Sequence, residues 1–217
     1  MRQTIPARYR YVVIEGPIGA GKTSLARKLA ELGGHQIRLE DPAGNPFLER
    51  FYRDSARFAL PAQLAFLLER VEEMRDIAQQ EIGGASLIAD FLPEKDALFA
   101  RLTLADDELA LYRALSAHIS MPRRTPDLVI YLQASPEALF SRIQKRAIPM
   151  ELQISDAYLR ALCEIYSEFF YHYAAAPVLT IDTEHLNPAE NAHDFDLLLE
   201  RIEHMRGRKE VFVKGTR

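Results

Sequence analysis

The chain has 217 residues, of which 48% are hydrophobic and 27% charged, with a formal net charge of −4. These values are typical of a globular domain with a sizeable core, and the acidic balance argues against a nucleic-acid polymer as partner. The single cysteine, Cys163, excludes an internal disulfide and a cysteine-based zinc site. Without a signal-peptide pattern or a run of 18 apolar residues, we expect a cytoplasmic protein with no membrane partner.

The first pattern along the chain is a nucleotide-binding loop. An apolar, β-branched run at 11–14 predicts a buried strand, and Leu25 and Leu29 follow at helical spacing. Between them, GPIGAGKT at 16–23 matches G-x-x-x-x-G-K-[ST] without a mismatch. The alternative, a glycine-rich turn that carries a lysine by chance, does not explain the strand and the helix. The motif therefore predicts binding of a nucleoside triphosphate.

The residue types of this loop suit phosphate chemistry. Glycines let backbone N–H groups surround a phosphate at a helix N-terminus, where the helix dipole favours anions. The charge of Lys22 suits the β- and γ-phosphates, and the Thr23 hydroxyl suits Mg²⁺. We therefore expect ATP and Mg²⁺ as ligands, held by Gly16, Pro17, Ile18, Gly19, Ala20, Gly21, Lys22, Thr23 and Ser24.

The next segment places an acid beside this loop. A short strand at 36–39 ends in Glu40, and a short helix begins at 45–48 and runs through Tyr52. Acids just past the carboxyl end of a parallel strand lie where open sheets bind ligands. An acid in a surface loop is an equal alternative on position alone.

Two polar residues interrupt the apolar face of the next helix, predicted over 61–80. Gln63 and Arg70 are two turns apart and share that face with Leu67. Polar groups in such a place need partners, and a ligand base is one possibility. Solvated surface positions are the alternative.

A second strand, at 86–90, ends in Asp90, a carboxylate suited to Mg²⁺ opposite the loop. Residues 91–104 carry several charges and are predicted to be irregular. A helix at 106–120 follows, with an acidic first turn. Asp90 is thus a candidate metal ligand beside Thr23.

A third strand at 127–132 leads into a helix that Ser135 caps and that runs to about residue 147. Arg142 and Arg146, four residues apart, face the same way. This cationic pair could close over a triphosphate, and a solvated basic helix end is the alternative.

Strands and helices alternate to the end of the chain. A helix at 155–175 carries an aromatic stripe typical of core or subunit interface, and a strand at 178–181 and a helix at 192–206 follow. The tail at 210–217 is either an edge strand or loose. We therefore expect a single α/β domain over residues 1–217 with a doubly wound parallel sheet of about five strands and helices on both faces, the P-loop NTPase fold.

Together these features resemble the deoxynucleoside kinase family, nearest to the bacterial deoxyadenosine/deoxyguanosine kinases, over about residues 9–182. LEDP at 39–42, NPFL at 45–48 and FYRD at 51–54 are similar to the family's E-P…N-P-F-L…F-Y-x-D stretch. The resemblance implies ATP-dependent phosphorylation of the 5′-hydroxyl of a deoxynucleoside, purines preferred, in nucleotide salvage. It also implies a homodimer.

The resemblance assigns roles in binding the deoxynucleoside. It implies that Glu40 is the general base on the 5′-hydroxyl and that Tyr52 contacts the 3′-hydroxyl. Gln63 falls at the position that binds the base edge. Arg70 and Asp96 match the arginine and the carboxylate that read the base together with this glutamine. Asp96 lies six residues after the strand-end acid Asp90.

A helical lid of about residues 142–152 follows from the same resemblance. Arg142 and Arg146 align with arginines that contact phosphates, and Glu151 aligns with an acid that accepts from the 3′-hydroxyl. With Lys22 and Glu40, the two arginines make up the expected catalytic set.

Two positions depart from the family pattern. An arginine usually follows the strand-end acid, but this chain has Phe91 there, and a later lid arginine is replaced by Ile148. Either activity is reduced or another cation replaces the arginine at position 91, and Lys95 and Arg101 are the candidates.

Three other functions remain open. A nucleoside monophosphate kinase related to thymidylate kinase would need extra cations for the acceptor phosphate, and Arg70 and Arg101 could serve. A non-catalytic nucleotide-binding member is permitted by Phe91, although intact Lys22 and Glu40 argue against it. An NTPase switch ranks last, because the sequence has no guanine-reading N-K-x-D.

Overall fold

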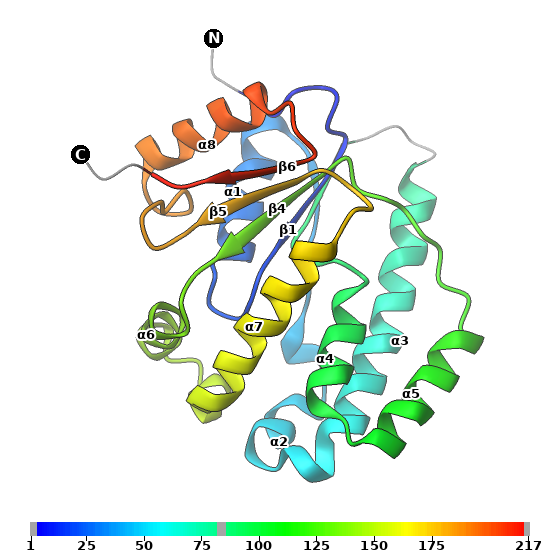
Figure 1. Cartoon of the computed structure of the whole chain (residues 1–217). Coiled ribbons are helices and arrows are strands. Elements are labelled where there is room, and N and C mark those ends of the chain that lie inside the picture. Colours follow the sequence, from blue (N-terminus) through cyan, green and yellow to red (C-terminus); the bar gives the residue numbers. More distant parts are fainter. Residues whose placement is uncertain (1–3, 82–85, 215–217) are drawn as a thin grey trace.

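The computed structural model describes residues 4–81 and 86–214 (Figure 1). Its sheet has six parallel strands in the order β2-β3-β1-β4-β5-β6. The strands are β1 (Tyr11–Glu15), β2 (Gln36–Arg38), β3 (Leu87–Ala89), β4 (Leu128–Gln133), β5 (Val178–Asp182) and β6 (Lys209–Phe212). The doubly wound parallel fold is confirmed, but with six strands rather than about five. The tail adds the edge strand β6, while residues 215–217 of the predicted tail lie outside the described residues.

The helices cover both faces of the sheet. They are α1 (Lys22–Gly33), α2 (Leu48–Arg53), α3 (Ser55–Glu81), α4 (Lys95–Thr103), α5 (Asp106–His118), α6 (Pro136–Arg146), α7 (Asp156–His172) and α8 (Ala192–His204). Helices α1 and α8 lie behind the sheet in Figure 1, and α7 crosses in front. All five residues of β1 are buried, as a parallel strand covered on both faces requires.

One helix prediction was confirmed with a different start, and one segment predicted to be irregular is helical. The helix expected over 61–80 begins at Ser55 and contains Pro61 in its interior. A proline there removes one helical hydrogen bond, and Ala59 and Ala62 on either side of it are buried in the packing of this helix. Residues 91–104, predicted to be irregular, contain α4, because charged residues at its start are buried rather than exposed.

The aromatic stripe of α7 lies in the core. The rings of Tyr166 and Phe170 stack on Tyr131 of β4, with centroids 6.4 and 4.1 Å away. A second apolar cluster joins α2, α3, α4 and α5, away from the sheet. Among the described helices, none is both long and apolar enough to cross a membrane.

Candidate active site

The loop between β1 and α1 lies at the carboxyl ends of the parallel strands. At Gly16 a Cβ atom would lie 2.5 Å from the Leu132 carbonyl oxygen, so no larger residue fits. Gly21, at φ +95°, precedes α1 in a conformation that glycine adopts readily. The Lys22 ammonium donates to the carbonyls of Gly16 and Pro17 at 2.7 and 3.2 Å. Burial lowers the pKa of Lys22, and the charge of Glu15 opposes this.

Asp90 joins this loop to the end of β2. Its Oδ2 accepts from the Thr23 hydroxyl at 2.6 Å, and its Oδ1 accepts from the backbone N–H of Glu40 at 2.8 Å. Because β2 and β3 are neighbours, their carboxyl ends bring both acids to one place. One carboxylate and one hydroxyl, completed by substrate phosphates and water, fit the oxygen coordination of Mg²⁺.

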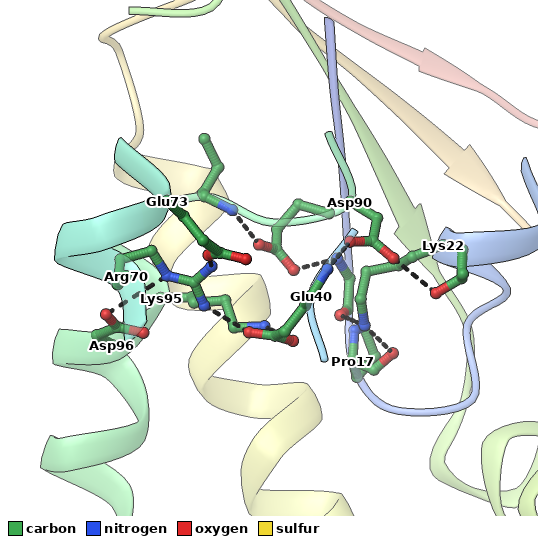
Figure 2. A network of polar contacts seen from close by, with 12 residues as sticks. Pro17, Lys22, Glu40, Arg70, Glu73, Asp90, Lys95 and Asp96 are labelled. Atoms are coloured by element: carbon green, nitrogen blue, oxygen red, sulfur yellow. Dashed lines mark hydrogen bonds and ion pairs between the residues drawn. The ribbon is translucent and has the colours of Figure 1, made fainter. Parts of the chain in front are cut away.

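Glu40 lies between two cations (Figure 2). Its Oε1 accepts from Arg70 and its Oε2 from Lys95, each at 2.5 Å. Burial raises the pKa of Glu40, but Lys95 and Arg70 outweigh burial and lower it to about 2. Burial lowers the pKa of Lys95, but Glu40 and Glu15 together outweigh burial and raise it, so the lysine stays charged.

The two candidates for the cation missing at position 91 lie in different places. Lys95 reaches Glu40 from the start of α4. Arg101, two turns along the helix, pairs with Glu168 at 2.9 Å, with both side chains more than half exposed. Of the two, Lys95 is the one that the fold brings to the site.

Arg70 is surrounded by carboxylates and is only 1% exposed. Besides Glu40, it contacts Glu73 at 2.7 Å and Asp96 at 3.6 Å. The Phe91 ring lies under its guanidinium, 4.1 Å from centroid to Cζ. Figure 2 shows these carboxylates around the guanidinium. The carboxylates raise the pKa of Arg70 despite its burial, which lowers it.

A cavity opens between the loop and the helices α2, α3 and α4. It brings together loop residues and most of the acceptor-site candidates: Ile18, Gly19, Gly21, Lys22, Thr23, Ser24, Glu40, Tyr52, Gln63, Asp90, Lys95, Asp96, Arg146 and Glu151. Burial raises the pKa of Asp96 to about 7, although Arg70 opposes this. Within the described part of the chain, no hydrogen bond reaches Asp96 Oδ2. We call this space the inner cavity.

A second hollow lies on the other side of the loop, and we call it the outer groove. It is lined by Gly19, Ala20, Gly21, Ser24, Leu25, Leu132, Ser141, Arg142, Lys145, Arg146, Thr183, Asn187, Pro188, Ala189 and Glu190. Arg142 donates to the Thr183 hydroxyl and carbonyl at 2.9 and 2.6 Å. Arg146 pairs with Glu151 and lines both spaces. The loop thus separates the outer groove from the inner cavity.

Two acids of this network were not among the residues that the sequence singled out. Glu15, 1% exposed, accepts from the backbone N–H groups of Gly16 and Leu92 and from the Tyr166 hydroxyl. Its signal was a charged residue ending an otherwise apolar strand. Glu73 lies one turn after Arg70, a spacing that matters only once Arg70 is known to be buried.

Comparison with known proteins identifies relatives along most of the chain. The family model "Deoxynucleoside kinase" matches residues 12–205. A deoxyguanosine kinase of Bacillus subtilis is 30% identical, over 90% of this chain and 97% of that protein. A deoxyadenosine kinase of Dictyostelium discoideum is 31% identical, over 84% of this chain and 76% of that protein. The structure of deoxyadenosine kinase from M. mycoides with bound dATP has the same fold, with a TM-score of 0.78 at 23% identity, over 89% of this chain and 99% of that one.

Proposed function

Because the chain belongs to the deoxynucleoside kinase family and is therefore a phosphotransferase that acts on deoxynucleosides, we propose that it transfers the γ-phosphoryl group of ATP to the 5′-hydroxyl of a purine deoxynucleoside. The observation that carries the proposal is Glu40, held in the inner cavity beside the phosphate-binding loop. A deoxyguanosine kinase and a deoxyadenosine kinase among the relatives support the purine preference.

The inner cavity would hold the deoxynucleoside. Glu40 would accept the hydroxyl proton, and Tyr52 and Glu151 would contact the 3′-hydroxyl. Gln63 and Asp96 would face the base. Phosphoryl transfer depends on positioning and charge stabilisation more than on covalent catalysis, and the ion pairs around Glu40 supply the positioning.

The loop and the outer groove would hold the nucleoside triphosphate. Lys22 would leave the Gly16 and Pro17 carbonyls to bind the β- and γ-phosphates, with Arg142 and Arg146 on the opposite side. Mg²⁺, when bound through Thr23 and Asp90, would neutralise developing charge on the phosphates. Residues 142–152 would act as a lid, and unchanged amide hydrogen exchange there on adding nucleotide would contradict this.

A nucleoside and a nucleoside monophosphate place different requirements on the cavity that binds the acceptor. A monophosphate acceptor needs a free cation for its phosphate. Arg70 is occupied by three carboxylates and Arg101 lies on the surface, so neither is available for that role. This arrangement favours the uncharged nucleoside.

The test is a coupled assay of the purified protein with ATP, with and without Mg²⁺, on each of the four deoxynucleosides and dTMP. We expect turnover on deoxyadenosine or deoxyguanosine that a chelator abolishes. Turnover on dTMP alone would assign a monophosphate kinase. No turnover on any acceptor, with ATP still bound, would favour a non-catalytic member of the family.

A homodimer is proposed through α3 and α5 rather than α7, whose aromatic stripe is buried. Leu68, Leu111 and Leu115 are 61%, 49% and 41% exposed on these two neighbouring helices (Figure 1), and exposed apolar patches mark interfaces. We expect light scattering to give twice the chain mass and L111E/L115E to give the monomer. V211E, on the exposed edge strand β6, is the control and should stay dimeric. A wild-type monomer would refute the proposal.

A further inference from the structure

Carboxylates hold both terminal amino groups of Arg70 beside the inner cavity. Its two terminal amino groups donate to Glu40 and Glu73, at 2.5 and 2.7 Å. The Phe91 ring covers one side of the guanidinium plane at 4.1 Å. Arg70 is 1% exposed and is not among the residues that line the cavity. The two terminal amino groups of this arginine are thus engaged before a base arrives, while its Nε has no hydrogen-bond partner among the described residues and lies 3.6 Å from Asp96 Oδ2.

Glu73 and Phe91 together account for this orientation. Glu40 alone would hold one amino group of Arg70 and leave the other free to turn toward Asp96, whose Oδ2 lies 3.6 Å from Arg70 Nε. Glu73, one helical turn along α3, holds the second amino group. Phe91 occupies the position expected for an arginine and supplies a ring face instead of a competing charge.

Gln63 and Asp96 remain to meet the base. Both are buried and both line the inner cavity. A glutamine amide pairs in two places with adenine, accepting from the 6-amino group and donating to a ring nitrogen, and a carboxylate accepts from an amino group. The pairing typical of guanine uses an arginine that donates to O6 and N7. A carboxylate cannot form a hydrogen bond with a carbonyl oxygen, because both groups are acceptors.

On the basis of the proposed phosphorylation of deoxynucleosides, we propose that the cavity selects adenine, with its 6-amino group beside an unprotonated ring nitrogen, over guanine, which has a carbonyl at that position, and that Glu73 determines this specificity. Glu73 acts through Arg70: with Phe91 it keeps the guanidinium from donating to a base carbonyl. Glu73 is therefore a positioning residue that does not itself touch the base.

The first experiment uses the wild-type protein and two acceptors that differ at one edge. Deoxyinosine has a carbonyl where deoxyadenosine has the 6-amino group. At about pH 8.5, above the pKa of about 7 that burial gives Asp96, that group is a carboxylate. We expect kcat/KM to favour deoxyadenosine by about 10- to 100-fold, the discrimination of one bidentate base contact. Calorimetric binding of both nucleosides without ATP should show the same preference.

The second experiment changes Glu73. E73Q removes the charge that holds the second amino group, so Arg70 can donate to a carbonyl or to Asp96. Either event lowers the preference for deoxyadenosine over deoxyinosine, by about tenfold. The matched control is E72Q: Glu72 makes the same i,i+3 pair with Arg75 at 2.7 Å, on the exposed side of α3. It should leave the preference unchanged.

The outcomes separate the two proposals. The base-reading inference would be overturned if the wild-type protein used both nucleosides equally, or if E73Q and E72Q changed the preference to the same extent. Either result, obtained with turnover, would leave the kinase function standing. Without turnover on any acceptor, the kinase proposal fails and the binding preference still decides the inference. If E73Q does not fold, E73D takes its place, because the shorter side chain withdraws the carboxylate from Arg70 and should lower the preference in the same way.

Discussion

Replacing Glu40 with glutamine is expected to lower kcat on a deoxynucleoside by about 10²- to 10⁴-fold, the usual contribution of a positioned base. Glutamine keeps the shape of the side chain but removes the charge that Arg70 and Lys95 hold. A carboxylate with a pKa of about 2 is a weak base. Its main contribution would be to orient the hydroxyl, whose proton it would take as the oxygen bonds to phosphorus.

The pH dependence provides a sharper version of this test. Glu40 is ionised throughout the neutral range because its pKa is lowered to about 2. Any change of kcat/KM with pH in that range must therefore come from other groups, such as Asp96, whose pKa burial raises to about 7 with a contribution from the charge of Glu40. E40Q removes that charge, so it should lower the profile and move its inflection to lower pH. D41N, at the exposed neighbouring position, is the control and should retain full activity. An E40Q variant with near wild-type kcat would contradict the assignment.

E40Q also carries a cost in stability. The substitution leaves two buried cations without one of their carboxylates, a change that typically costs about 3–5 kcal/mol. The free energy of unfolding must therefore be measured alongside kcat. The rate should be expressed per folded molecule, so that a loss of fold is not taken for a loss of chemistry.

Loss of Lys95 is the second large effect. We expect K95A to lower kcat/KM by about 10²- to 10³-fold, the usual cost of removing one preorganised donor. Lys95 binds Oε2 of Glu40 while Arg70 binds Oε1, so the removal of Lys95 frees one carboxylate oxygen to move. Because Glu40 keeps Lys95 charged despite burial, K95R should restore part of the activity and K95M none.

R101A is the matched control for K95A. Arg101 belongs to the same helix, α4, but pairs with Glu168 at the surface, where an exposed ion pair contributes little. Its removal should change kcat/KM less than about twofold. If neither K95A nor R101A reduced kcat/KM, no residue of α4 would replace the arginine missing at position 91.

The P-loop and the parallel sheet could be predicted because their signals are local. Gly16, Lys22 and Thr23 carry the motif, and a buried parallel strand is apolar along its whole length. The start of α4 could not be predicted in this way. Lys95 and Asp96 have the composition of a surface loop, and only tertiary contacts with Glu40 and Arg70 explain why they are buried.

The candidate site was predictable in part for the same reason. Helical spacing placed Gln63 and Arg70 on one face, and both are buried. Spacing did not reveal which way the guanidinium points. That depends on Glu73, Phe91 and Glu40, which come from three separate segments of the chain.

The strand order has a consequence for synthesis of the chain on the ribosome. β1 carries the phosphate-binding loop and pairs with β3 and β4, and β4 ends roughly 120 residues after β1. At about 5–20 residues per second, the nascent chain carries an apolar β1 with an unpaired edge for roughly 6 to 24 seconds. Translation through β4 therefore sets the earliest moment at which the site can assemble. Until then β1 is the segment most exposed to aggregation or to capture by chaperones.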